Sequence, residues 1–137
     1  MTLHPITMLR ADIWFHAKLM PLVLKFQSFS TMLNNADVAN VDRYQGVPTE
    51  AISKLVIRST HHPWFMRNRR CLRQGLIGYQ FMRKAGYRPE LHFGVEVESL
   101  DAPNINAHCW VVLDGKPVLN DILAGMETIF IHSLEKK

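Results

Sequence analysis

Residues of the three types that make up a thiol hydrolase occur in the second half of the chain. They are Cys71, the adjacent pair His108–Cys109, and Asp121. In such an enzyme a thiolate attacks a carbonyl carbon, an imidazole moves the proton, and a carboxylate fixes the imidazole tautomer. Two cysteines compete for the role of nucleophile, so the elements that carry them decide between Cys71 and Cys109.

Cys71 is expected to begin a helix that runs to Ala85 and ends at Gly86. A cysteine at a helix N-terminus is favoured as a thiolate by the helix dipole and by free N–H groups. The N–H of Cys71 is also a candidate donor to an oxyanion. Gln74 is a weaker candidate for the second donor. The sequence therefore favours Cys71 as the nucleophile.

Segment 106–121, NAHCWVVLDGKPVLND, predicts a β-hairpin with Asp114 and Gly115 as its two loop residues. Neighbours along a strand point to opposite faces, so a His108 that faces a cleft leaves Cys109 facing the core. Cys109 is then expected to be a small buried hydrophobe. The adjacent histidine and cysteine are therefore not expected to act as a pair.

The hairpin also predicts which residues face each other. The expected pairs are Leu113 with Lys116, Val112 with Pro117, Val111 with Val118, Trp110 with Leu119, Cys109 with Asn120, and His108 with Asp121. His108 and Asp121 would form a non-hydrogen-bonded pair with Cβ atoms roughly 4.5–5.5 Å apart. That distance suits a carboxylate that orients an imidazole. A three-residue loop would shift the register by one residue and remove the match.

Four further residues are candidates for substrate contacts: Trp110, Gln74, Arg67 and Arg70. Trp110 shares the expected face of His108 and would line the cleft. Arg67 and Arg70 belong to a basic run before and at the Cys71 helix, which raises the positive potential there. A solvated loop for the arginines and a core position for the tryptophan remain open alternatives.

The elements needed to position these residues are predicted by periodicity. The first sixty or so residues are expected to be helical, with a kink or break at Pro21 and a helix start near Pro48. Apolar and polar residues alternate over 91–97 and predict a strand. The hairpin comes next, and a last strand is expected near 128–132. We expect one α+β domain over residues 1–137, helical to about residue 86, with its helices packed on a small antiparallel sheet.

Composition limits the classes of function. The chain has 137 residues, 47% of them hydrophobic and 20% charged, as in a globular domain. A net charge of +4 is too weak to argue for a nucleic-acid partner. His61–His62 has no accompanying metal-site spacing, so no metal or other cofactor is expected. No secretory signal or sufficiently long apolar run is present, and we expect a cytoplasmic protein without a membrane partner.

The stretch from Cys71 to Asp121 resembles the leader peptidases of lasso-peptide biosynthesis, in their stand-alone form. This family is a branch of the transglutaminase-like cysteine proteases. The matching segments are CLRQGLIGYQFMRKAGYRPELHFGV and NAHCWVVLDGKPVLND. Two features depart from the family pattern. Gln74–Gly75 stand where Arg-Ser or a similar pair usually follows the nucleophile's helix start, and Cys109 stands where alanine commonly follows the histidine.

The resemblance implies a transglutaminase- or papain-like core with Cys71 as nucleophile, His108 as base and Asp121 as orienting acid. It implies removal of the leader from a ribosomally made precursor peptide before macrocyclisation. It also implies two protein partners, a separate leader-recognition protein and an ATP-dependent cyclase. Two alternatives remain open: acyl transfer with the same triad, and a catalytically silent peptide-binding module.

Overall fold

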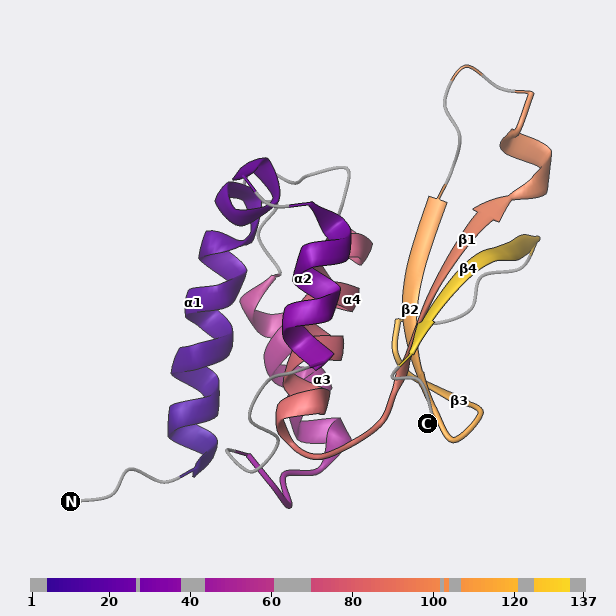
Figure 1. Ribbon diagram of the computed structural model, residues 1–137. Helices are drawn as coiled ribbons and strands as arrows, with labels where there is room; N and C mark the ends of the chain where they lie inside the picture. Colours follow the sequence, from indigo (N-terminus) through magenta and orange to yellow (C-terminus); the bar gives the residue numbers. More distant parts are fainter. Residues whose placement is uncertain are drawn as a thin grey trace.

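The computed structural model describes residues 5–26, 28–37, 44–60, 70–101, 103, 107–120 and 125–133. Its helices are α1 Pro5–Phe26, α2 Phe29–Asp37, α3 Thr49–Ser59 and α4 Arg70–Lys84. Its strands are β1 Glu90–Glu96, β2 Ala107–Leu113, β3 Lys116–Leu119 and β4 Met126–Ser133, with a short 3-10 helix, η2 Val97–Ser99, after β1. Figure 1 shows the helices gathered on one side of the sheet. The predicted α+β fold is confirmed.

The four strands form one antiparallel sheet in the order β3-β2-β1-β4. Strand β1 is central and pairs with both β2 and β4. The predicted alternation holds at Leu91, which is buried against the helices, but Val97 already belongs to the 3-10 helix. The Cys71 helix begins one residue earlier than predicted and ends as expected at Gly86, whose φ is 92°. The N–H groups of Gly86 and Tyr87 close that end on the carbonyls of Arg83 and Met82.

Helix α1 runs as one element through Pro21, so the break allowed for in the sequence does not occur. A proline has no N–H, and Pro21 therefore leaves the carbonyl of Ala17, four residues earlier, without its helical partner. The buried guanidinium of Arg73 fills that role. Its Nε and Nη2 donate hydrogen bonds of 2.9 and 2.6 Å to the Ala17 oxygen. Proline and arginine together thus fasten the first turn of α4 to the middle of α1.

Helix α4 lies close against the sheet because two of its residues have no side chain. A Cβ added at Gly75 would sit 2.4 Å from Sγ of Cys109, and one added at Gly78 would sit 2.2 Å from Cδ2 of Leu119. Real Cβ atoms do not approach other atoms so closely. Both sheet residues are buried, and the glycines admit them directly against the helix backbone.

The register of the β2–β3 hairpin is correct near the turn and wrong beyond it. Asp114 and Gly115 both have positive φ, as the predicted turn requires, and Val112 faces Pro117. The next residue, Val111, faces Leu119 instead of Val118, because a β-bulge shifts the pairing. The predicted pair of Val111 with Val118 is therefore wrong, and the shift removes the basis for the pairs predicted beyond it. The register argument that placed His108 opposite Asp121 is lost with them.

The bulge has a physical cause in the contacts of β3 with the helices. The bulge places Leu119, instead of the smaller Val118, beside Val111 on the face toward Gly78. The Leu119 side chain fills the core there. The carbonyl of Val118 accepts a hydrogen bond of 2.6 Å from the hydroxyl of Ser53 on α3. The extra residue of a bulge is left out of the strand ladder, and here α3 provides the partner.

The close contact at Gly75 predicts a coupling between two substitutions. Gly75→Ala is expected to lower the free energy of unfolding by about 1–3 kcal/mol, because the new methyl group overpacks the space held by the Cys109 thiol. In a Cys109→Ala background the loss should shrink or reverse, since alanine favours a helix over glycine by about 1 kcal/mol. Urea unfolding of the four proteins measures the coupling.

The matched control is Gly78→Ala, which meets Leu119 instead of Cys109. Its effect should be the same with or without the Cys109 thiol. Strictly additive effects of Gly75→Ala and Cys109→Ala on the free energy of unfolding would contradict direct packing of Cys109 on Gly75.

Candidate active site

Cys71 is the second residue of α4 and is partly buried. The first-turn N–H groups of a helix have no partner inside the helix, so its N-terminal end attracts negative charge. The first turn of α4 contains no acidic residue that would oppose this effect. Sγ of Cys71 lies 3.9 Å from the carbonyl oxygen of Ala107, the first residue of β2. The structure therefore brings the thiol to the residue directly before His108.

His108 is partly buried and lies in a row of aromatic rings on the sheet. Its imidazole stacks on the indole of Trp110 at 5.8 Å between ring centroids, and the same indole stacks on His92 of β1 at 5.6 Å. Gly94 makes room for this indole, because a Cβ there would lie 2.8 Å from the ring. Trp110 is only 2% exposed. The prediction that Trp110 shares a face with His108 is confirmed.

Cys109 points the other way, into the core below α4, as predicted. It is 2% exposed, and its Sγ lies against Gly75. Burial raises the pKa of its thiol far above the ordinary value, and the nearby Cys71 thiol adds to the rise. A thiol that stays protonated in the core is a poor nucleophile. Cys109 therefore serves packing, as a small apolar residue does.

Asn120, at the end of β3, is a site residue that the sequence did not single out. Its Nδ2 donates hydrogen bonds to two backbone carbonyls, that of Cys109 at 2.9 Å and that of Cys71 at 3.4 Å. Its φ of 60° is a left-handed conformation that asparagine tolerates better than most residues. Asn120 thus joins the nucleophile's turn of α4 to β2. The sequence does show an asparagine at the end of a predicted strand. It does not show which carbonyls the side chain binds, because tertiary packing brings those carbonyls to it.

The remaining predicted site residues divide into two groups. Gln74, three residues after Cys71, is buried and only 8% exposed, so it offers little surface to a substrate. Asp121 and Arg67 lie outside the described residues, as does the side chain of Arg70. The backbone of Arg70 begins α4 next to Cys71.

A His–Asp pair between β4 and α2 has a structural purpose. Nε2 of His132 on β4 lies 2.9 Å from a carboxylate oxygen of Asp37 on α2. The phenol of Tyr79 donates to the other oxygen, and Arg83 adds an ion pair at 3.9 Å. Burial raises the pKa of Tyr79, and the hydrogen bond to Asp37 raises it further, so the phenol keeps its proton and remains a donor. With no thiol among these partners, the cluster ties α2 and α4 to β4.

The described ranges contain neither a metal-site cluster nor a membrane-spanning helix. In those ranges, no three His, Cys, Asp or Glu side chains gather in an arrangement fit for a metal ion. No helix in the same ranges combines the length and apolar character needed to cross a bilayer.

The family model described as "Transglutaminase-like superfamily" matches residues 17–130. The chain belongs to this superfamily. The matched range includes Cys71 and His108, and superfamily members are typically cysteine-type enzymes. A search of curated proteins and a search of solved structures each returned no match. Transglutaminase-like membership thus agrees with the resemblance seen in segment 71–121 at the level of the superfamily.

The contrast between the two thiols predicts different rates of alkylation. With iodoacetamide at neutral pH, Cys71 should react at least about tenfold faster than Cys109, because Cys109 is buried and its pKa is raised. Raising the pH through the ordinary thiol range should leave Cys109 unreactive while the protein stays folded. Peptide mass spectrometry of timed samples measures both sites, and urea-unfolded protein, in which both thiols react, is the control. Equal native rates would contradict the assignment.

Proposed function

We propose that the protein is a cysteine peptidase with Cys71 as nucleophile, His108 as general base and Asp121 as the acid that orients the imidazole. One observation carries this proposal. The Cys71 thiol, at the N-terminus of α4, reaches the carbonyl of Ala107, so the nucleophile and His108 are held at the same end of β2. Cysteine-type chemistry in the transglutaminase-like superfamily supports it.

The reaction divides into two steps. His108 accepts the Cys71 proton, the thiolate attacks the scissile carbonyl, and the leaving amine takes the proton from the imidazolium. Water, deprotonated by His108, then hydrolyses the thioester and restores the thiol. First-turn N–H groups of α4, including that of Cys71, are suited to stabilise the oxyanion, because no acidic residue occupies that turn.

The role of Asp121 is supported by its neighbour in sequence. Asn120 is held to the backbones of Cys71 and Cys109, so Asp121 directly follows a residue anchored at the nucleophile. A carboxylate there would hold one ring nitrogen of His108 and stabilise the imidazolium. The indole of Trp110, which stacks on His108, restricts rotation of the imidazole.

The substrate that we propose is the leader–core junction of a ribosomally made lasso-peptide precursor, cut once to free the amine of the core. Support comes from the segments 71–95 and 106–121, whose order and local sequence resemble the stand-alone leader peptidases. A leader-recognition protein and an ATP-dependent cyclase are the partners of this proposal. The unusual Cys109 after the histidine does not argue against it, because this side chain packs on Gly75 and away from His108.

Acyl transfer is the second candidate, because the transglutaminase-like superfamily includes enzymes whose thioester is attacked by an amine. The two candidates share every step up to the thioester. Adding a labelled primary amine separates them: a peptidase releases the acid, whereas an acyltransferase incorporates the label.

Substitutions of the two cysteines test the proposal on a precursor peptide. Cys71→Ala should lower the cleavage rate at least about 10³-fold, since the covalent step is lost. His108→Ala should cause a loss of similar size, and Asp121→Asn a substantial one with the substrate KM little changed. Chromatography of the released leader measures the rates, and circular dichroism confirms that each variant is folded.

The matched control is Cys109→Ala, which removes a thiol of the same chain that packs in the core. It should keep cleavage within about tenfold of the wild type while lowering stability modestly. Normal cleavage by Cys71→Ala, or loss of cleavage only in a folded Cys109→Ala protein, would overturn the proposal.

A further inference from the structure

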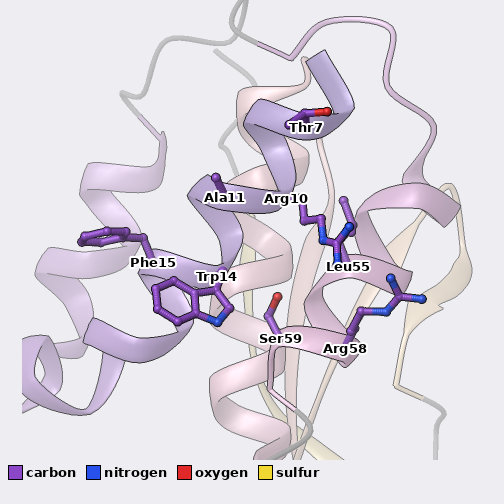
Figure 2. A pocket seen from close by; sticks show the side chains of 8 residues that line it. All are labelled: Thr7, Arg10, Ala11, Trp14, Phe15, Leu55, Arg58 and Ser59. Carbon is purple, nitrogen blue, oxygen red and sulfur yellow. The ribbon is translucent and has the colours of Figure 1, made fainter. Parts of the chain in front are cut away.

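A groove of about 490 Å³ lies between α1 and α3, on residues that the proposed catalytic mechanism does not use. Its size falls within the range of pockets that bind ligands. The residues that line it are Thr7, Arg10, Ala11, Trp14 and Phe15 from α1, and Leu55, Arg58 and Ser59 from α3. Figure 2 shows the side chains of Arg10 and Arg58 extending from the two helices toward the side of Leu55, with Trp14 near Ser59.

The aromatic part of the groove is open to solvent. Trp14 is 51% exposed and Phe15 is 60% exposed. Farther along the same helix, Leu19 and Leu22 are also exposed, which extends the apolar surface. Soluble proteins seldom leave a contiguous apolar surface uncovered unless it binds something. Aromatic side chains at the centre of such a surface are the usual anchors of a protein interface.

The charged residues that line the groove are all positive. None of the lining residues is acidic, and among the described residues neither Arg10 nor Arg58 has a hydrogen bond or an ion pair to its guanidinium. A third cation, Lys18, lies 5.7 Å from the centroid of the Trp14 ring. A guanidinium pairs best with a planar carboxylate, to which it donates two parallel hydrogen bonds. The groove therefore complements an acidic group next to an apolar one.

We propose that the α1–α3 groove binds a peptide segment of another polypeptide, with an apolar side chain against Trp14 and Leu55 and a carboxylate against Arg10 and Arg58. A peptide is favoured over an anionic membrane because the two arginines border a hollow, whereas a lipid surface is met by a helix that presents its charges and apolar residues outward. The hydroxyls of Thr7 and Ser59 lie in the same lining and suit the peptide's backbone. The groove is a docking site whether or not Cys71 is catalytic.

The experiment selects the ligand chemistry without assuming a partner. A random peptide library displayed on phage is selected on the folded wild-type protein and counter-selected on Arg10→Glu/Arg58→Glu. The selected peptides should combine aromatic or aliphatic residues with Asp or Glu. Synthesised with a fluorescent label, they should bind the double variant and Trp14→Ala at least about tenfold more weakly than the wild type, as measured by anisotropy.

Three controls make the result specific. Lys116→Glu changes the charge of an exposed residue of the β2–β3 hairpin, outside the groove, and should bind the peptide as the wild type does. A peptide with its acidic residues changed to lysine should recover binding to Arg10→Glu/Arg58→Glu. Cys71→Ala should bind unchanged, so failure of the peptidase proposal and failure of this one are distinguished.

Several outcomes would overturn the proposal. One is a selected set without acidic residues, and another is equal weakening by Lys116→Glu, which would indicate nonspecific charge attraction. Phosphatidylserine vesicles that bind through Arg10 and Arg58 while no peptide does would assign the surface to a membrane. A concentration-dependent dimer abolished by Trp14→Ala, without peptide binding, would assign it to a second copy of the chain.

Discussion

The close approach of α4 to β2 is the contact on which the rest of the arrangement depends. It exists because Gly75 has no side chain, so the Cys109 thiol packs directly on the helix backbone. Cys71 lies one helical turn before Gly75 and therefore meets the same strand two residues earlier, at Ala107. The two cysteines thus have complementary tasks. Cys109 packs between helix and strand at Gly75, and this close approach places the Cys71 thiol at Ala107, the residue before His108.

Three side chains keep this approach in place by donating hydrogen bonds to backbone carbonyls of other elements. Arg73 binds the carbonyl of Ala17, which Pro21 deprives of its helical donor. Ser53 binds the carbonyl of the bulge residue Val118, and Asn120 binds those of Cys71 and Cys109. An unpaired buried carbonyl costs about 1–3 kcal/mol, so these side chains both permit the irregular backbone and position it.

Local patterns predicted the features that depend on local physics. The helix start within one residue of Cys71, the Asp114–Gly115 turn and the inward direction of Cys109 follow from capping, turn geometry and strand alternation, and the structure confirms them. The register beyond Val112 was not predictable in this way, because the bulge depends on Ser53 and Gly78, which belong to other elements. The continuity of α1 through Pro21 likewise required a partner from α4. The placement of Asp121 opposite His108 rested on the uninterrupted register and now rests on the family resemblance.

The central claim is that Cys71, held at the start of β2, forms a thioester with a peptide while Cys109 does not. The most direct measurement is mass spectrometry of the protein after a brief reaction with a precursor peptide and an acid quench. The account predicts an acyl adduct on the proteolytic fragment that contains Cys71, and no adduct on the fragment that contains Cys109. An adduct on Cys109, or cleavage at the normal rate by a Cys71→Ala protein that forms no adduct at all, would contradict it.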